Sequence, residues 1–213
     1  MPLPFVIASF LDRFLYRHPF EGGSARRYAR DERPAFGDLD DRLLDALALD
    51  GVGSLLELGC GPATFARRAA ARHPGLVVTA VDPSRVFARR ADGIAVIRAC
   101  GEALPIADHS IDVAICLSSI RHVRDRAATL RELRRVLRGT LMIVELDPAA
   151  EPHRIAAHAK GLASGLLRAA FGPLVVRTAP PAKAILSLAA AAGFALRELR
   201  HDPIQPVYIM ELS

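Results

Sequence analysis

Two glycines and the residues around them have the spacing most suggestive of chemistry. Gly59 and Gly61 follow the apolar run Ser54–Leu58 and precede a helical stretch, Ala63–Arg72. Glycine permits backbone angles and a close ligand approach that a β-carbon would block. Amides at such a strand-to-helix turn bind nucleoside or carboxylate oxygens. The loop therefore indicates a ligand site, although tight turns also use glycine for packing alone.

Asp82 is the second chemical group. It ends the apolar run Leu76–Val81, about 20 residues after the glycines, where doubly wound folds place an acid that accepts hydrogen bonds from a ribose diol. The alternative is an Asp that caps the helix beginning near Ser84. The loop and the acid together predict a nucleoside site.

A nicotinamide dinucleotide is the rival ligand. Its fingerprint G-x-G-x-x-G fails here, because Thr64 stands at the third glycine. Glu57, two residues before Gly59, is not part of that fingerprint. An NAD-type oxidoreductase is therefore the less favoured interpretation.

The surrounding segments alternate between apolar runs and amphipathic stretches. Strands that are apolar on both faces and alternate with helices indicate an α/β fold, a Rossmann-like doubly wound sheet that is mostly parallel. Two final apolar runs predict a C-terminal antiparallel pair. The seven expected strands are Ser54–Leu58, Leu76–Val81, Ile94–Arg98, Ile111–Leu117, Thr140–Leu146, Phe194–Arg200 and Val207–Leu212.

The chain of 213 residues suits one large domain. We expect a variable N-terminal cap over 1–37, with a helix at Phe5–Tyr16. The binding domain is expected over 38–213, with an alanine-rich helical insert at about 149–180. The apolar part of that insert, Leu162–Phe171, is expected to be a substrate lid, a membrane-touching surface or ordinary packing.

Composition excludes several classes. Hydrophobic residues make up 51% of the chain, which argues against disorder. The net charge is +5, but the arginines are interleaved with acids, which indicates solvated helix faces rather than a nucleic-acid groove. The cysteines have no metal-ligand or disulfide spacing, so we expect no metal site and a cytoplasmic location. No run is long enough to span a bilayer, and peripheral contact with an anionic surface stays open.

With these motifs in place, the sequence resembles class I S-adenosylmethionine (SAM)-dependent methyltransferases of the methyltransferase-11 type. The resemblance covers about residues 50–147, with a weaker match near 189–212. Beyond the loop and Asp82, three stretches carry it: EALPIADHSIDV at 102–113, IRHVRD at 120–125 and LRELRRVLRG at 130–139.

The resemblance implies SAM as cofactor and assigns roles by position. One group would shape the pocket for the methionine part, Asp82 with Pro83 would hold the ribose, and a third group would border the adenine. Leu117 and Ser118 would lie near the transferred methyl, and Tyr28 would belong to a lid over the substrate. The methionine group is Glu57, Gly59, Cys60 and Gly61; the adenine group is Cys100, Gly101 and Glu102.

Three departures from the family pattern stand out. Ala63 replaces a common third glycine, and Cys100 replaces an Asp that often contacts the adenine amine. The usual Pro-Gly-Gly turn is reduced to Gly139, which predicts a shortened turn. A non-catalytic SAM- or nucleoside-binding protein on the same fold therefore remains an alternative.

Methyl transfer needs a general base only if the acceptor must lose a proton. His122 is the candidate base, and the alternative is a loop histidine bonded to backbone. Arg121 is a candidate for holding an anionic acceptor, or is solvent-exposed. The basic stretch at His153, Arg154, His158 and Lys160 is expected to be a solvated face rather than a metal site. The sequence thus predicts methyl transfer from SAM to a small-molecule acceptor.

Overall fold

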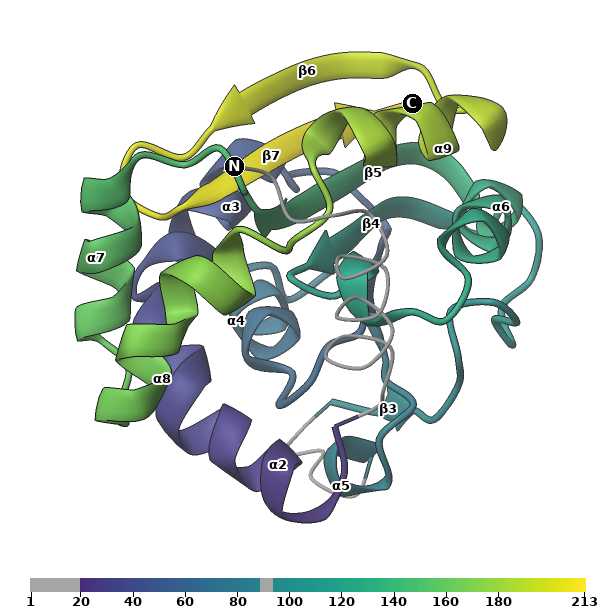
Figure 1. Ribbon diagram of the computed structural model, residues 1–213. Helices are drawn as coiled ribbons and strands as arrows, with labels where there is room; N and C mark the ends of the chain where they lie inside the picture. Colours follow the sequence, from purple (N-terminus) through teal and green to yellow (C-terminus); the bar gives the residue numbers. More distant parts are fainter. Residues whose placement is uncertain (1–19, 89–93) are drawn as a thin grey trace.

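A seven-stranded sheet forms the centre of the molecule (Figure 1), in a computed structural model that describes residues 20–88 and 94–213. The strand order is β3-β2-β1-β4-β5-β7-β6. The first five strands along the chain pair in parallel, and β7 pairs antiparallel with both β5 and β6. The Rossmann-like sheet with a closing antiparallel pair is confirmed. The strands are β1 (Ser54–Leu58), β2 (Val77–Val81), β3 (Val96–Ile97), β4 (Ile111–Leu117), β5 (Leu137–Leu146), β6 (Leu196–His201) and β7 (Val207–Leu212).

Both faces of the sheet are covered because its central strands are apolar on both sides. In β4, the side chains of Val113 and Ile115 pack on one face, and Ala114 and Cys116 pack on the other. The first face carries α3 (Leu39–Leu47), α4 (Thr64–Arg72) and α7 (Pro152–Lys160). The second carries α6 (Arg126–Val136) and α9 (Ala182–Ala191). The sheet is therefore the middle of three layers.

The junction of α6 and β5 differs from the sequence expectation of a shortened turn. The helix ends at Val136 and β5 begins at the next residue, Leu137, with no intervening turn. A β-carbon on Gly139 would lie 2.2 Å from the carbonyl oxygen of Asp112. Glycine is required there because the two backbones touch where the β4–β5 register shifts.

The insert and the N-terminal segments lie together at one side of the molecule. Figure 1 shows α7 and α8 (Gly165–Ala170) beside the N-terminal helices, and α7 contacts η3 (Arg33–Phe36). The remaining helical elements are α2 (Gly22–Arg27), η2 (Tyr28–Glu32), α5 (Arg85–Ala88), η4 (Ile120–His122) and η5 (Phe171–Val176). The helix expected at Phe5–Tyr16 lies outside the described residues. The boundary between residues 37 and 38 stays a prediction.

Part of the insert is core. Leu162 and Phe171 are buried, whereas Leu166 on α8 is 82% exposed. His158 is also buried, so the expectation of a solvated face is wrong for this residue. Its position on α7 turns it inward, against Phe36 and Phe171.

Candidate functional site

A hollow opens at the carboxyl ends of β1, β2 and β4, where the strand order changes direction. Ligands of doubly wound sheets bind at this switch point. This central hollow encloses about 850 Å³ of empty space, its opening included. Eleven of the residues singled out from the sequence line it: Tyr28, Gly59, Gly61, Asp82, Pro83, Cys100, Gly101, Glu102, Leu117, Ser118 and His122.

The loop after β1 is fixed by backbone bonds and by one close approach. The amides of Gly59 and Cys60 both donate to the carbonyl oxygen of Val81 at the end of β2 (2.7 and 3.1 Å). Gly59 has φ +71°, and a β-carbon there would lie 2.4 Å from Cβ of Ser119. Glycine is therefore required at 59 by conformation and by space.

Ala63 explains one departure from the family pattern. It precedes α4 in a left-handed conformation, with φ +54°. Glycine adopts that conformation without strain, whereas alanine does so at a cost of about 1 kcal/mol or more. The left-handed conformation explains why the family often has glycine at this position, and this chain adopts the same conformation with alanine.

Asp82 lies against the glycine loop and combines both roles considered for it. Its Oδ2 accepts the amide of Gly61 (2.9 Å), and its Oδ1 accepts the amide of Ser84 (2.8 Å). Burial raises the pKa of this carboxyl, and the two amide bonds act in the opposite direction. A carboxylate has about four lone-pair sites, so oxygens facing the hollow keep capacity for a diol.

Glu57 and Cys60 lie behind the loop and do not line the central hollow. The Oε2 atom of Glu57 accepts the amide of Ala66 in the first turn of α4 (2.9 Å). Burial raises the pKa of Glu57 to about 8. The Cys60 side chain is buried between α4 and β2, beside Ala66 and Ala80. Both residues support the loop from its far side.

Tyr28 and His122 face each other across Phe20. The ring centroid of Phe20 lies 5.0 Å from that of Tyr28 and 5.1 Å from that of His122. The Nε atom of Arg121 is 3.2 Å from Nε2 of His122, so this imidazole nitrogen accepts from the guanidinium. Phe20, Tyr28 and His122 all line the hollow.

Arg121 itself is placed elsewhere. It is 7% exposed, so the solvent-exposed alternative is wrong. Its Nε lies 3.5 Å from Oε1 of Glu145, which is fully buried on β5. Its charge therefore has a carboxylate partner within the protein, and the side chain lines a second cavity rather than the hollow.

Sequence reasoning missed several lining residues. Ser119 follows directly on Ser118, and its Oγ donates to the carbonyl oxygen of Leu58 (2.6 Å). Because Ser118 was expected near the transferred methyl, the adjacent Ser119 is also a candidate from the sequence. Phe20 carried none, because an aromatic ring in an irregular segment has no pattern that places it. The missed residues are Phe20, Leu58, Phe87, Ser119, Val123 and Arg124.

Comparisons with known proteins agree with the geometry. Residues 56–143 match the family described as "Methyltransferase domain". The ubiquinone/menaquinone biosynthesis C-methyltransferase UbiE of Syntrophotalea carbinolica is 32% identical over 155 residues, which span 59% of this chain and 65% of that protein. An uncharacterized 37.1 kDa protein in transposon Tn4556 of Streptomyces fradiae is 37% identical over 115 residues, 49% of this chain and 33% of that protein. The chain thus spans less than two thirds of each curated relative.

Solved structures share the fold. A SAM-dependent methyltransferase from Aquifex aeolicus superposes with a TM-score of 0.65 at 14% identity, covering 88% of this chain and 95% of that one. A SAM-dependent methyltransferase from Thermotoga maritima, titled a possible histamine N-methyltransferase, gives 0.62 at 19% identity, with 97% and 99% covered.

The sheet order and the hollow at its switch point define a Rossmann-like α/β protein with a cavity where such folds bind ligands. Residues 56–143 match the methyltransferase-domain family, and the chain has the fold of the solved SAM-dependent methyltransferases that it resembles. Both solved structures are titled SAM-dependent methyltransferases, and the lining of the hollow fits SAM, with two glycines, a carboxylate with spare acceptors and several aromatic rings. Within the described residues no helix is both long and apolar enough to cross a membrane.

Proposed function

We propose that the protein transfers the methyl group of SAM to a small-molecule acceptor. The observation that carries the proposal is the bond from the Gly61 amide to Asp82, which joins the glycine loop to the candidate ribose-binding carboxylate at the wall of one hollow. Bound there, SAM supplies an electrophilic methyl on a sulfonium. The acceptor's lone pair or π electrons would take up that methyl group, and sulfur would keep the electron pair of the broken S–CH₃ bond.

The chain's own residues bind and orient the reactants. Gly59 and Gly61 leave room for the methionine part, and Asp82 accepts the ribose hydroxyls beside Pro83. The loop Cys100–Glu102 borders the adenine, and Leu117 and Ser118 lie at the methyl end. Positioning and exclusion of water supply most of the rate for a reaction of this kind. Glu57 and Cys60 act indirectly, by holding the loop.

His122 is the proposed base for an acceptor that must lose a proton. It lines the same hollow as Ser118. Because its Nε2 accepts from Arg121, either the other ring nitrogen takes the proton or the Arg121 contact must break. The relative named a C-methyltransferase favours carbon as the acceptor atom.

Location and partner class complete the proposal. We propose a cytoplasmic protein, supported by free thiols at Cys60, Cys100 and Cys116. Interleaved charges over the sheet-covering helices favour a small molecule over nucleic acid as the acceptor.

A non-catalytic SAM-binding protein is the second candidate, favoured by the strained Ala63 and by the exposed Cys100 in the adenine loop. Single-turnover assays with methyl-labelled SAM against a panel of metabolites separate the two. We expect label in at least one acceptor and formation of S-adenosylhomocysteine. SAM binding with no transfer to any acceptor would favour the second candidate. Mass spectrometry of a co-purified ligand would identify the acceptor directly.

A further inference from the structure

A second cavity lies next to the central hollow, between the N-terminal segments and the insert. This insert cavity is small, with about 350 Å³ of empty space when the solvent at its opening is included. Six of its ten lining side chains are apolar, among them Phe36, Leu162 and Phe171. The polar ones are Tyr28, Glu32, Arg121 and His158.

The insert cavity and the central hollow are separated by single side chains. Tyr28 lines both spaces. Arg121 lines the insert cavity, and its Nη2 donates to Oγ of Ser118 in the hollow (3.4 Å). A molecule in the insert cavity would thus be next to the methyl end of SAM, on the far side of Tyr28 and Arg121.

The charges around the insert cavity are balanced. Glu145, fully buried, takes the Arg121 amide on Oε2 (3.3 Å) and lies 3.5 Å from Nε of the same residue. Glu32 lies 3.9 Å from Nε of Arg27, and burial raises the pKa of its carboxyl. Six apolar side chains and a compensated cation favour an uncharged ligand over an ion.

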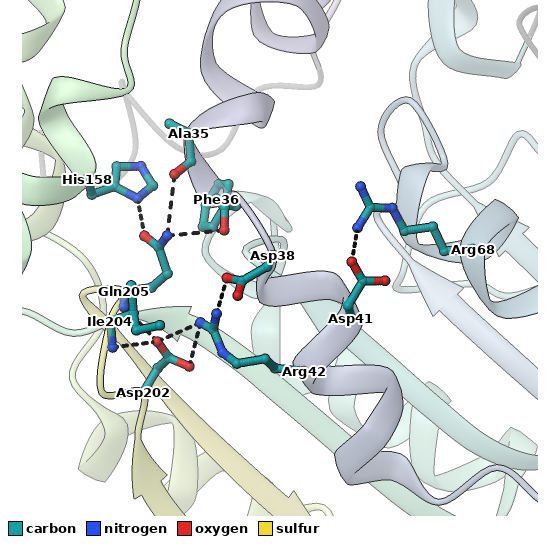
Figure 2. A network of polar contacts seen from close by, with 10 residues as sticks. All are labelled: Ala35, Phe36, Asp38, Asp41, Arg42, Arg68, His158, Asp202, Ile204 and Gln205. Atoms are coloured by element: carbon teal, nitrogen blue, oxygen red, sulfur yellow. Dashed lines mark hydrogen bonds and ion pairs between the residues drawn. The ribbon is translucent and has the colours of Figure 1, made fainter. Parts of the chain in front are cut away.

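His158 has a fixed orientation in this cavity. Its ring stacks on Phe171 at 4.5 Å with an interplanar angle of 9°, and meets Phe36 edge-on at 4.9 Å. Figure 2 shows Gln205 held between His158 and the carbonyl groups of Ala35 and Phe36. The Gln205 amide nitrogen donates to both carbonyls (3.4 and 3.1 Å), so its oxygen faces Nδ1 of His158 at 2.6 Å.

This network determines which imidazole nitrogen carries the proton. The Gln205 oxygen is an acceptor, so Nδ1 of His158 is the N–H, and Nε2 carries a lone pair in the neutral ring. Burial lowers the pKa of His158, which keeps the ring neutral. Among residues 20–88 and 94–213, Nε2 makes no hydrogen bond. His158 thus brings an oriented acceptor to a cavity whose lining is mostly apolar.

We propose that the insert cavity is a ligand pocket beside the methyl-transfer site, and that it takes a small, uncharged ring compound whose single hydroxyl donates a hydrogen bond to Nε2 of His158. A phenol has this chemistry. The location beside the methyl-transfer site rests on the proposed function, whereas the binding preference does not.

The test compares two probes of nearly equal shape, p-cresol and p-xylene, which differ by hydroxyl for methyl. Each is titrated by ligand-observed NMR into the whole protein saturated with S-adenosylhomocysteine, so that the central hollow is filled. Because the hydrophobic effect alone favours p-xylene, tighter binding of p-cresol by about three- to tenfold requires a hydrogen bond. Equal affinities, or a preference for p-xylene, would overturn the proposal.

Two variants locate the preference. In His158→Asn the amide nitrogen of the new side chain lies near the position of Nδ1 and can still donate to Gln205, whereas the acceptor Nε2 is lost. The ratio of the affinities for p-cresol and p-xylene should then fall to about one. Leu167→Trp, at a half-buried wall position, should weaken both probes alike. A preference that survives in His158→Asn, or binding unchanged in Leu167→Trp, would contradict the assignment. If S-adenosylhomocysteine failed to bind, the methyl-transfer proposal would fail, and the same titrations without nucleoside would still test the cavity.

Discussion

The central hollow and the insert cavity lie side by side, but they are built in different ways. The hollow is lined mainly by residues that directly follow strand ends, so a short stretch of sequence determines each part of its wall. The insert cavity is assembled from η2, η3, η4 and the insert, with Gln205 of the β6–β7 connection locking His158. The comparison indicates that the cofactor site follows from local motifs, whereas the second site depends on tertiary packing.

The largest effect is expected where the loop motif meets the sheet. Gly59→Ala combines a left-handed φ with a β-carbon 2.4 Å from Cβ of Ser119. We expect a loss of unfolding free energy of about 3 kcal/mol or more, measured by urea denaturation. Adding Ser119→Gly removes the clash but not the strain, so the double variant should recover part of the loss. A single variant as stable as the parent would show that the loop tolerates a side chain.

The buried carboxyl behind the loop should make stability depend on pH. The pKa of Glu57 is raised by burial from 4.5 to about 8 in the folded state. The contribution of the protonated Glu57 to the free energy of unfolding is therefore fully present below pH 4.5 and is lost as the pH rises towards 8. The reason is that the unfolded chain releases this proton at a lower pH than the folded protein does. Relative to the parent, Glu57→Gln should gain a few kcal/mol, on the order of 3, between pH 5 and pH 8. Urea unfolding at several pH values measures this difference, and a difference independent of pH would contradict it.

Replacing Asp82 is expected to weaken the binding of SAM. Asp82→Ala removes the proposed ribose contacts and also the acceptor for the Gly61 amide. We expect SAM to bind at least about tenfold more weakly, since bonds to charged groups contribute about 1.5–3 kcal/mol. Asp108→Ala, which removes an exposed carboxylate paired with Arg135, is the matched control and should stay within about twofold. Equal effects from the two variants would remove the special role of Asp82.

The smallest effect is expected in the network behind the insert cavity. Gln205→Leu removes the acceptor for Nδ1 of His158 and the donors to the carbonyl groups of Ala35 and Phe36. The thermal unfolding transition should show a loss of about 1–2 kcal/mol. SAM affinity should stay unchanged, because none of these groups lines the central hollow. A parallel loss of SAM affinity would show that the two regions are coupled.

The same contrast explains what the sequence could predict. The strands Ser54–Leu58, Ile111–Leu117 and Val207–Leu212 were located to the residue, because uniform apolar runs bounded by polar residues or glycine leave little choice. Gly61 and Asp82 were expected to meet because the carboxyl ends of neighbouring parallel strands share one edge.

The remainder depended on contacts between distant segments. The burial of His158 could not be predicted, because a basic stretch at helical spacing also fits a solvated face. Its partner Gln205 lies 47 residues away, in an irregular connection without a pattern. Arg121 was likewise undecided, since the compensating Glu145 belongs to a strand 24 residues later. Gly139 was interpreted as a turn remnant, whereas its role is a backbone contact with β4.

Calorimetric titration of the whole protein with SAM, and separately with NADH, tests the central claim most directly. The account predicts one-to-one binding of SAM, weakened at least about tenfold by Asp82→Ala, and no heat from NADH. Binding of NADH without binding of SAM would contradict it.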